Sequence, residues 1–194
     1  MGAILQSLGR TVLAGVVLLV ILVLATTGAN VGASYAWWTF YMRWLHVLSG
    51  VMWIGLLWYF NFVQIPSMPK IPDEQKPAIS KVIAPTALFW FRWAALATVV
   101  TGLLLAFMNG YIVAALGLQK PFTAIGIGMW LALVMAFNVW FIIWPNQKKA
   151  LGIVTVEAAE KAKAARLAML TSRFNTMFSI PMLYCMVAQQ NGGL

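Results

Sequence analysis

One histidine lies in an apolar, aromatic-rich stretch, and its neighbours are spaced so that they share one side of a helix. Arg43, His46, Gly50 and Trp53 are separated by three, four and three positions, and such spacings return to the same helical face. A neutral imidazole is a common axial ligand of haem iron. Gly50 would let a flat macrocycle approach the backbone, and Arg43, one turn nearer the helix start, would pair with a propionate. With Trp53 completing it, this face predicts a haem b site in which His46 binds the iron.

The same histidine also has a structural interpretation, namely a hydrogen bond to a neighbouring helix that holds a bundle together. His46 is the only histidine in the chain, so two histidines of one chain cannot ligate a haem. A haem at this position needs a methionine as its second ligand, an open sixth position, or His46 of a second copy. No catalytic residue follows from these patterns.

Five further polar residues lie inside apolar segments, where hydrogen-bonding groups cost free energy unless they are paired. They are Asn61, Gln64, Asn138, Asn175 and Ser179. Hydrogen bonds between membrane helices contribute about 0.6–2 kcal/mol each. We expect these side chains to join helices, with Asn138 and Asn175 as helix-packing residues.

Small residues and two arginines complete the set of candidates. Gly128, Ala132 and Ala136 recur every four residues, a spacing that allows close helix approach, either within the chain or between copies. Arg92 and Arg173 suit a membrane boundary at which long basic side chains reach the surface. Their alternative interpretation is an inner site for an anion or a propionate.

The composition shows what kind of protein positions these residues. Of 194 residues, 62% are hydrophobic and only 9% are charged, against about 45–50% and about 25% in soluble domains. Too little polar surface remains to cover a water-soluble globule, so a soluble enzyme is excluded. The net charge of +9 fits anionic lipid headgroups rather than nucleic acid, because the basic residues lie between apolar runs. The single Cys185 excludes an intrachain disulfide.

A helix needs about 20 mostly apolar residues to cross the bilayer. The chain is therefore predicted to be all-α, a single polytopic membrane domain over residues 1–194. Five spans are expected, at about 11–27, 38–63, 85–108, 122–144 and 174–190. An Ala-rich cytoplasmic surface helix is expected at about 154–171, and residues 111–118 are expected to form a short interfacial or re-entrant turn.

The basic residues predict the orientation of these spans. Eleven of the 13 Lys and Arg residues fall in one set of loops, and only Arg43 and Lys120 fall on the opposite side. Because cytoplasmic loops carry the excess of Lys and Arg, the N-terminus is expected in the cytoplasm and the C-terminus outside. The expected location is the bacterial inner membrane.

Several stretches resemble one known family. Residues 144–149 read Trp-Pro-Asn-Gln-Lys-Lys, and residues 173–181 combine Arg173, Asn175-Thr176 and Ser179-Ile180-Pro181. With residues 44–64, 89–95, 101–103 and 137–140, they resemble the membrane domain of PuuD-type urate hydroxylases, the urate oxidase N-terminal domain family. More distantly, the Leu45-His46 pair is similar to small haem-binding membrane proteins of the HemJ and CopD-like kinds.

The resemblance implies a helical membrane module linked to redox chemistry and usually followed by a cytochrome c domain. It also implies that the position of His46 binds haem, as is thought for the HemJ and CopD-like proteins. The chain differs from the family in three respects: it ends without a cytochrome c domain, it has Phe174 where the family often has a histidine, and it lacks the histidine that the family often has near the end.

Two functions are therefore expected as alternatives. The chain is either a haem b redox module that transfers electrons, working with a separate cytochrome c, or a non-catalytic accessory subunit of a larger membrane energy-converting complex. Expected partners are the lipid bilayer, other membrane subunits or further copies of the chain. Whether it is an enzyme stays open.

Overall fold

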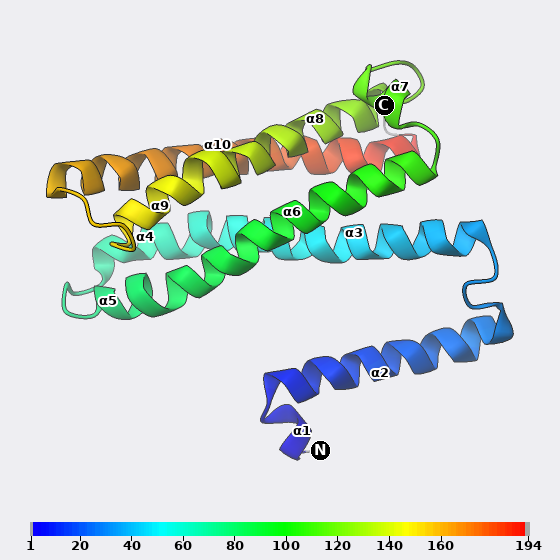
Figure 1. Ribbon diagram of the computed structural model, residues 1–194, viewed down its shortest axis with the longest axis horizontal. Helices are drawn as coiled ribbons and strands as arrows, with labels where there is room; N and C mark the ends of the chain where they lie inside the picture. The colour runs from blue at the N-terminus through cyan, green and yellow to red at the C-terminus, as the bar shows by residue number, and fades with distance from the viewer. Residues whose placement is uncertain (1, 193–194) are drawn as a thin grey trace. The chain divides into compact units, whose positions relative to one another are not determined.

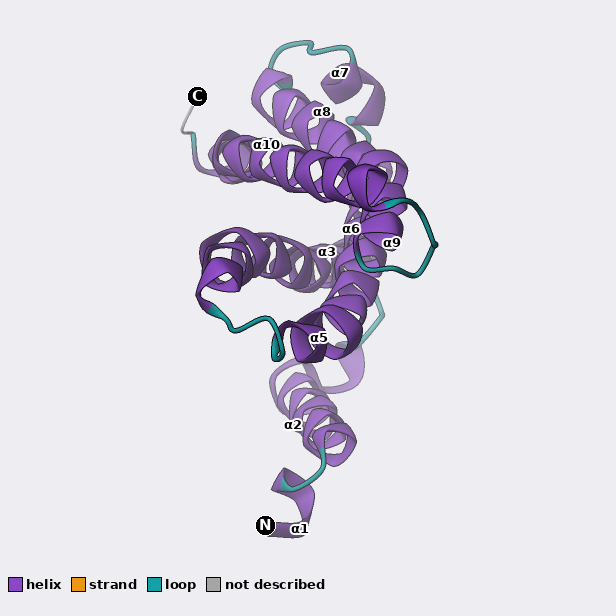
Figure 2. Ribbon diagram, turned by 90° about the vertical axis from the view of Figure 1, so that its left-hand side faces the viewer, coloured by secondary structure: helices purple, strands orange, loops and turns teal. Residues whose placement is uncertain are grey.

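The computed structural model describes residues 2–192, which contain helices and loops and no strand (Figure 2). The chain forms two compact units, the first ending at Tyr41 and the second beginning at Met42. The predicted all-α fold is confirmed for the described residues.

The first unit consists of α1 (Gly2–Leu5), α2 (Leu8–Thr27), the 3-10 turn η1 (Gly28–Asn30) and the start of α3 (Tyr35–Trp58). Gly28 and Gly32 have φ values of 59° and 72°, a region that glycine enters without steric cost. The indole of Trp38 donates to the Gly32 carbonyl at 3.1 Å. This bond ties the turn to the beginning of α3.

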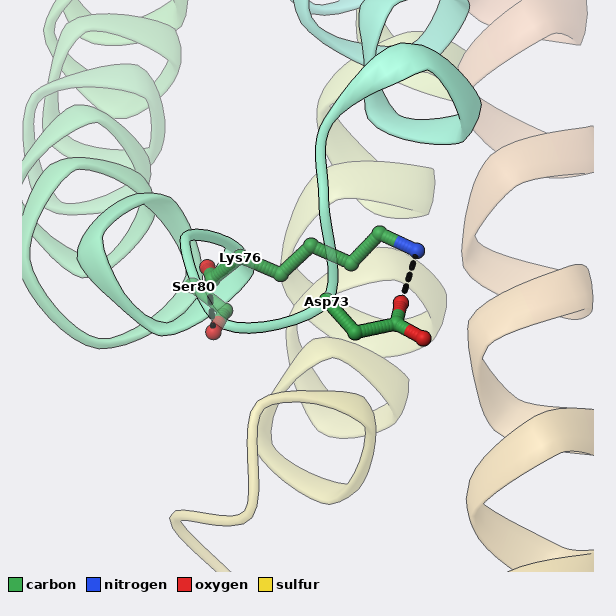
Figure 3. A network of polar contacts seen from close by, with 3 residues as sticks. All are labelled: Asp73, Lys76 and Ser80. Carbon is green, nitrogen blue, oxygen red and sulfur yellow. Dashed lines mark hydrogen bonds and ion pairs between the residues drawn. The ribbon is translucent and has the colours of Figure 1, made fainter.

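The second unit is a set of long helices with short connections (Figure 1). After α3 its elements are η2 (Tyr59–Gln64), α4 (Ile65–Ser67), η3 (Met68–Lys70), α5 (Lys76–Ala78), η4 (Ile79–Ile83), α6 (Ala84–Met108), α7 (Ile112–Leu116), α8 (Thr123–Phe137), η5 (Asn138–Ile143), α9 (Trp144–Ala150) and α10 (Ala158–Asn191). Across the loop before α5, Lys76 pairs with Asp73 at 2.6 Å, and the Ser80 hydroxyl donates to the Lys76 carbonyl (Figure 3).

Three of these elements, η2, η4 and η5, are π-helical, and a proline follows each of them within two residues. A proline in a helix lacks an N–H group and its ring collides with the carbonyl four residues earlier. For Pro66, Pro85 and Pro145 that carbonyl lies inside the π-helical segment. The wider turn accommodates the ring, so each long helix continues through its proline instead of ending there.

The α10 helix packs along α8, η5 and α9 (Figure 1), and the larger cluster of buried apolar side chains joins α3, η2, α6, α8 and η5. Gly128, Ala132 and Ala136 are all buried. A Cβ atom on Gly128 would lie 3.1 Å from the Cβ of Cys185 on α10. The small-residue ridge therefore lies against α10 of the same chain and brings the two helices close together.

Polar side chains bridge the same contact. Asn138 donates to the Asn175 side-chain oxygen at 2.8 Å, and Asn175 donates to the Met135 carbonyl at 2.9 Å. Asn61 donates to the Ser172 hydroxyl at 2.8 Å. These amides bond across helices, the geometry that the sequence predicts for them.

Four helical stretches of the described residues are long and apolar enough to cross a membrane: Leu8–Thr27, Tyr35–Lys70, Lys76–Met108 and Thr123–Ala150. They contain the first three predicted spans and all but the first residue of the fourth. The fifth predicted span, at 174–190, lies in α10, which is not among the four because its amides and hydroxyls lower its hydropathy.

The structure differs from the sequence prediction at the start of α10. The sequence predicts a separate surface helix at 154–171, but one continuous helix runs from Ala158 to Asn191. No proline or glycine interrupts it near Thr171, and Ala164 and Ala168 are buried, with α10 packed against α9. The alanines thus serve helix packing and do not simply rest on lipid headgroups.

Candidate functional site

The imidazole of His46 is held by α6. Its Nδ1 atom lies 2.9 Å from the Thr98 carbonyl oxygen and 3.3 Å from the Thr101 hydroxyl. A carbonyl oxygen can only accept a hydrogen bond, so Nδ1 carries the hydrogen. In the neutral ring Nε2 is then the unprotonated nitrogen with a free lone pair. No hydrogen bond occupies Nε2 within residues 2–192.

Gly102, four residues after Thr98, makes room for this ring. A Cβ atom on Gly102 would lie 2.8 Å from His46 Cε1 and 3.1 Å from Nδ1, closer than non-bonded carbon atoms approach. Only glycine lets the α6 backbone lie this near the imidazole. Thr98 and Gly102 therefore determine together where His46 points.

His46 borders a partly open cavity of about 620 Å³ lined by α3, α6, α8 and α10, with Tyr111 just before α7. Its volume is within the range of about 300–1,000 Å³ that is usual for small-molecule and cofactor sites. All four residues of the predicted face, Arg43, His46, Gly50 and Trp53, line it. A Cβ atom added at Gly50 would have a Thr98 methyl as its nearest neighbour, at 3.9 Å. Without a side chain at Gly50, the cavity reaches the backbone of α3 at this position.

Two donors beside the cavity lack acceptors within the described residues. They are the Nε atom of Arg43 and the indole nitrogen of Trp53, both buried. Unpaired buried donors cost free energy, typically about 1–3 kcal/mol each. A ligand that carries acceptor atoms would relieve this cost.

Sequence reasoning missed the polar residues contributed by other elements. Tyr111, Gln190 and Asn191 also line the cavity. Tyr111 stacks on Phe122 at 5.1 Å. Burial raises the pKa of the Tyr111 phenol, and the charge of nearby Arg43 opposes that rise. The part of the cavity next to Arg43 is therefore polar.

Three thioethers face the same cavity from the helices opposite α3. They belong to Met129 on α8 and to Met182 and Met186 on α10. The spacing of Met182, Met186 and Gln190 by four residues puts them on one face of α10. That periodicity was visible in the sequence, but it does not reveal which helix the face meets.

The remaining predicted residues lie elsewhere. Asn138, Asn175 and Ser179 are buried in the helix contact described above, and the Ser179 hydroxyl accepts from the Trp58 indole at 2.9 Å. Gln64 borders a separate cavity of about 50 Å³. Arg173 is exposed, whereas Arg92 is only 9% exposed.

Part of the cavity is lined by α8 and α10, which lie in a segment that resembles a known family. Residues 111–192 match the urate oxidase N-terminal family. The match confirms the predicted resemblance and covers α7 through α10, including both motifs at 144–149 and 173–181. His46 and α3 lie outside the matched part. No curated protein and no solved structure matches the chain.

The close contact at Gly102 predicts the result of a single substitution. Gly102→Ala should push the imidazole away from Thr98 and destabilise the protein by about 1–3 kcal/mol, the usual cost of overpacking. Thermal unfolding of the detergent-solubilised protein measures the effect. Gly55→Ala is the matched control, since a Cβ there meets nothing within 4 Å. Equal unfolding temperatures for both variants would contradict the contact.

Proposed function

We propose that this chain is a multi-pass membrane protein whose cavity binds haem b through His46, and that it serves electron transfer. The observation that carries the proposal is the bond from Nδ1 to the Thr98 carbonyl. It fixes the tautomer that leaves Nε2 free, and metal-binding histidines commonly donate their other N–H to a carbonyl, which also raises ligand basicity.

The cavity fits the cofactor in chemistry as well as in volume. Most of its lining is apolar, Gly50 leaves space on α3, and the orphaned Nε atom of Arg43 suits a carboxylate such as a propionate. Haem b would supply reversible one-electron chemistry. The protein's part is to orient His46, to balance the propionate charge through Arg43 and to exclude water with apolar walls.

The missing second histidine is compatible with this arrangement. Methionine and histidine together ligate haem in cytochromes c, where the methionine raises the reduction potential. Met129, Met182 and Met186 line the cavity from the helices opposite α3. Each of them is a candidate second ligand from the same chain, beside an open sixth position or His46 of a second copy.

The proposed topology has five spans, with α10 as the fifth, in the bacterial inner membrane. The polar side chains that lower the hydropathy of α10 support this view because they do not face outward: Asn175 and Ser179 are 0% exposed and Ser172 is 6% exposed. A helix that bonds its polar groups to neighbouring helices can cross a membrane despite them. Together with the Lys and Arg distribution, this supports an N-terminus in the cytoplasm and a C-terminus outside.

A spectrum tests the haem proposal. The reduced-minus-oxidised visible spectrum of the purified, haem-supplemented protein should show the sharp α band of a b-type haem, and His46→Ala should abolish it. Ser49→Ala is the matched control because its hydroxyl bonds only to the Leu45 carbonyl of its own helix. A well-folded wild-type protein without the band would refute haem binding and favour the accessory-subunit alternative.

Reporter fusions test the topology. Alkaline phosphatase, which is active only outside the cytoplasm, should be active when fused after Gly192 and inactive when fused after Thr155, between α9 and α10. Green fluorescent protein should give the opposite pattern. Equal phosphatase activity at the two positions would show that α10 does not cross the membrane.

A further inference from the structure

A buried arginine lies outside the His46 cavity, at the contact between α6 and α9. The guanidinium carbon of Arg92 is 3.4 Å from the ring centroid of Trp144, and the side chain is 9% exposed. Stacking on an indole stabilises a cation, but it does not neutralise the charge. Neither Arg92 nor Trp144 lines the His46 cavity.

A second cation shares the same indole. The Nζ atom of Lys148 is 5.7 Å from the Trp144 ring centroid. Two positive charges thus face one aromatic ring at the end of the bundle where the basic loops lie. Such an arrangement is repulsive unless an anion lies near it.

The acidic residues of the chain do not supply that anion. Of the four, Asp73 pairs with Lys76 (Figure 3), and Glu160 pairs with Lys149 at 2.5 Å. Within residues 2–192 no ion pair joins an acid to Arg92 or Lys148. An anion bound beside Arg92 and Lys148 would balance this charge.

Hydrogen bonding leads to the same conclusion. The Nη1 atom of Arg92 is buried without an acceptor in the described residues, and so is the indole nitrogen of Trp140. Trp140 lies in η5, four residues before Trp144, and its ring meets Trp93 of α6 edge to face at 5.6 Å. Both atoms are donors, so a ligand that pairs with them would carry acceptor atoms such as oxygens.

We propose that Arg92, Trp144 and Lys148 form a binding site for a phosphate group, supplied by the headgroup of an anionic membrane phospholipid. The planar guanidinium matches two phosphate oxygens and Lys148 adds a point charge. The anionic leaflet faces the cytoplasm, the side on which the excess of basic residues places this end of the bundle. A bound lipid would hold α6 against α9 independently of any haem.

The test measures the thermal stability of the delipidated protein in dodecyl maltoside with three probes: dioleoylphosphatidylglycerol, dioleoylphosphatidylcholine and sodium phosphate. Phosphatidylglycerol should raise the midpoint of unfolding by on the order of 2–4 °C. The shift should fall by at least half in Lys148→Gln and in Arg92→Gln. Lys148→Gln decides the outcome if Arg92→Gln fails to fold.

Lys163→Gln is the matched control, since it removes the same charge from an exposed position of α10 and should keep the full shift. A shift with sodium phosphate as well would assign the site to a free phosphate instead of a lipid. The proposal is overturned by equal shifts with phosphatidylcholine, by no shift with phosphatidylglycerol or phosphate, or by an equal loss in Lys163→Gln.

Discussion

The structure depends on one constraint: a polar group inside an apolar bundle must find its partner within the protein. Along α10 this requirement is met by Ser172, Asn175 and Ser179, which bond to Asn61, Asn138 and Trp58 on other elements. Each bond joins residues far apart in the sequence. Together they determine the face that α10 turns toward the bundle and its position along its neighbours.

The π-helical segments are part of the same arrangement. Asn61 and Asn138 lie in η2 and η5, the two widened turns that precede Pro66 and Pro145. At η5, Asn175 reaches across to the Met135 carbonyl just before the widened turn. At both places the proline is preceded by a π-helical turn. The asparagine amides then hydrogen-bond to backbone and side-chain groups in or beside that turn.

At the other end of the bundle the same rule positions His46. Its Nδ1–H bonds to a backbone carbonyl of α6, and Gly102 provides the space. The two groups of polar residues differ: Asn138 donates to Asn175, whereas Nε2 of His46 and the donors of Arg43 and Trp53 lie beside a cavity without a hydrogen-bond partner in the described residues.

Much of this could be predicted from sequence. Helical spacing placed Arg43, His46, Gly50 and Trp53 on one face, and all four line the cavity. Hydropathy located the four long apolar helices, while the fifth was found only as part of a longer helix. The contribution of Gly102, Tyr111 and Gln190 could not be predicted, because periodicity along one helix carries no information about which residues of another helix lie opposite.

Haem binding by His46 depends on Thr98, which holds the imidazole with Nδ1 protonated and Nε2 free. Because the chain has one histidine, nitrogen NMR of protein labelled with ¹⁵N only at histidine observes this ring alone. In haem-free protein, at a pH where the ring is neutral, the couplings to the ring protons should assign the hydrogen to Nδ1. A hydrogen on Nε2 would mean that the nitrogen required for iron is occupied, and that Thr98 does not prepare His46 to bind haem.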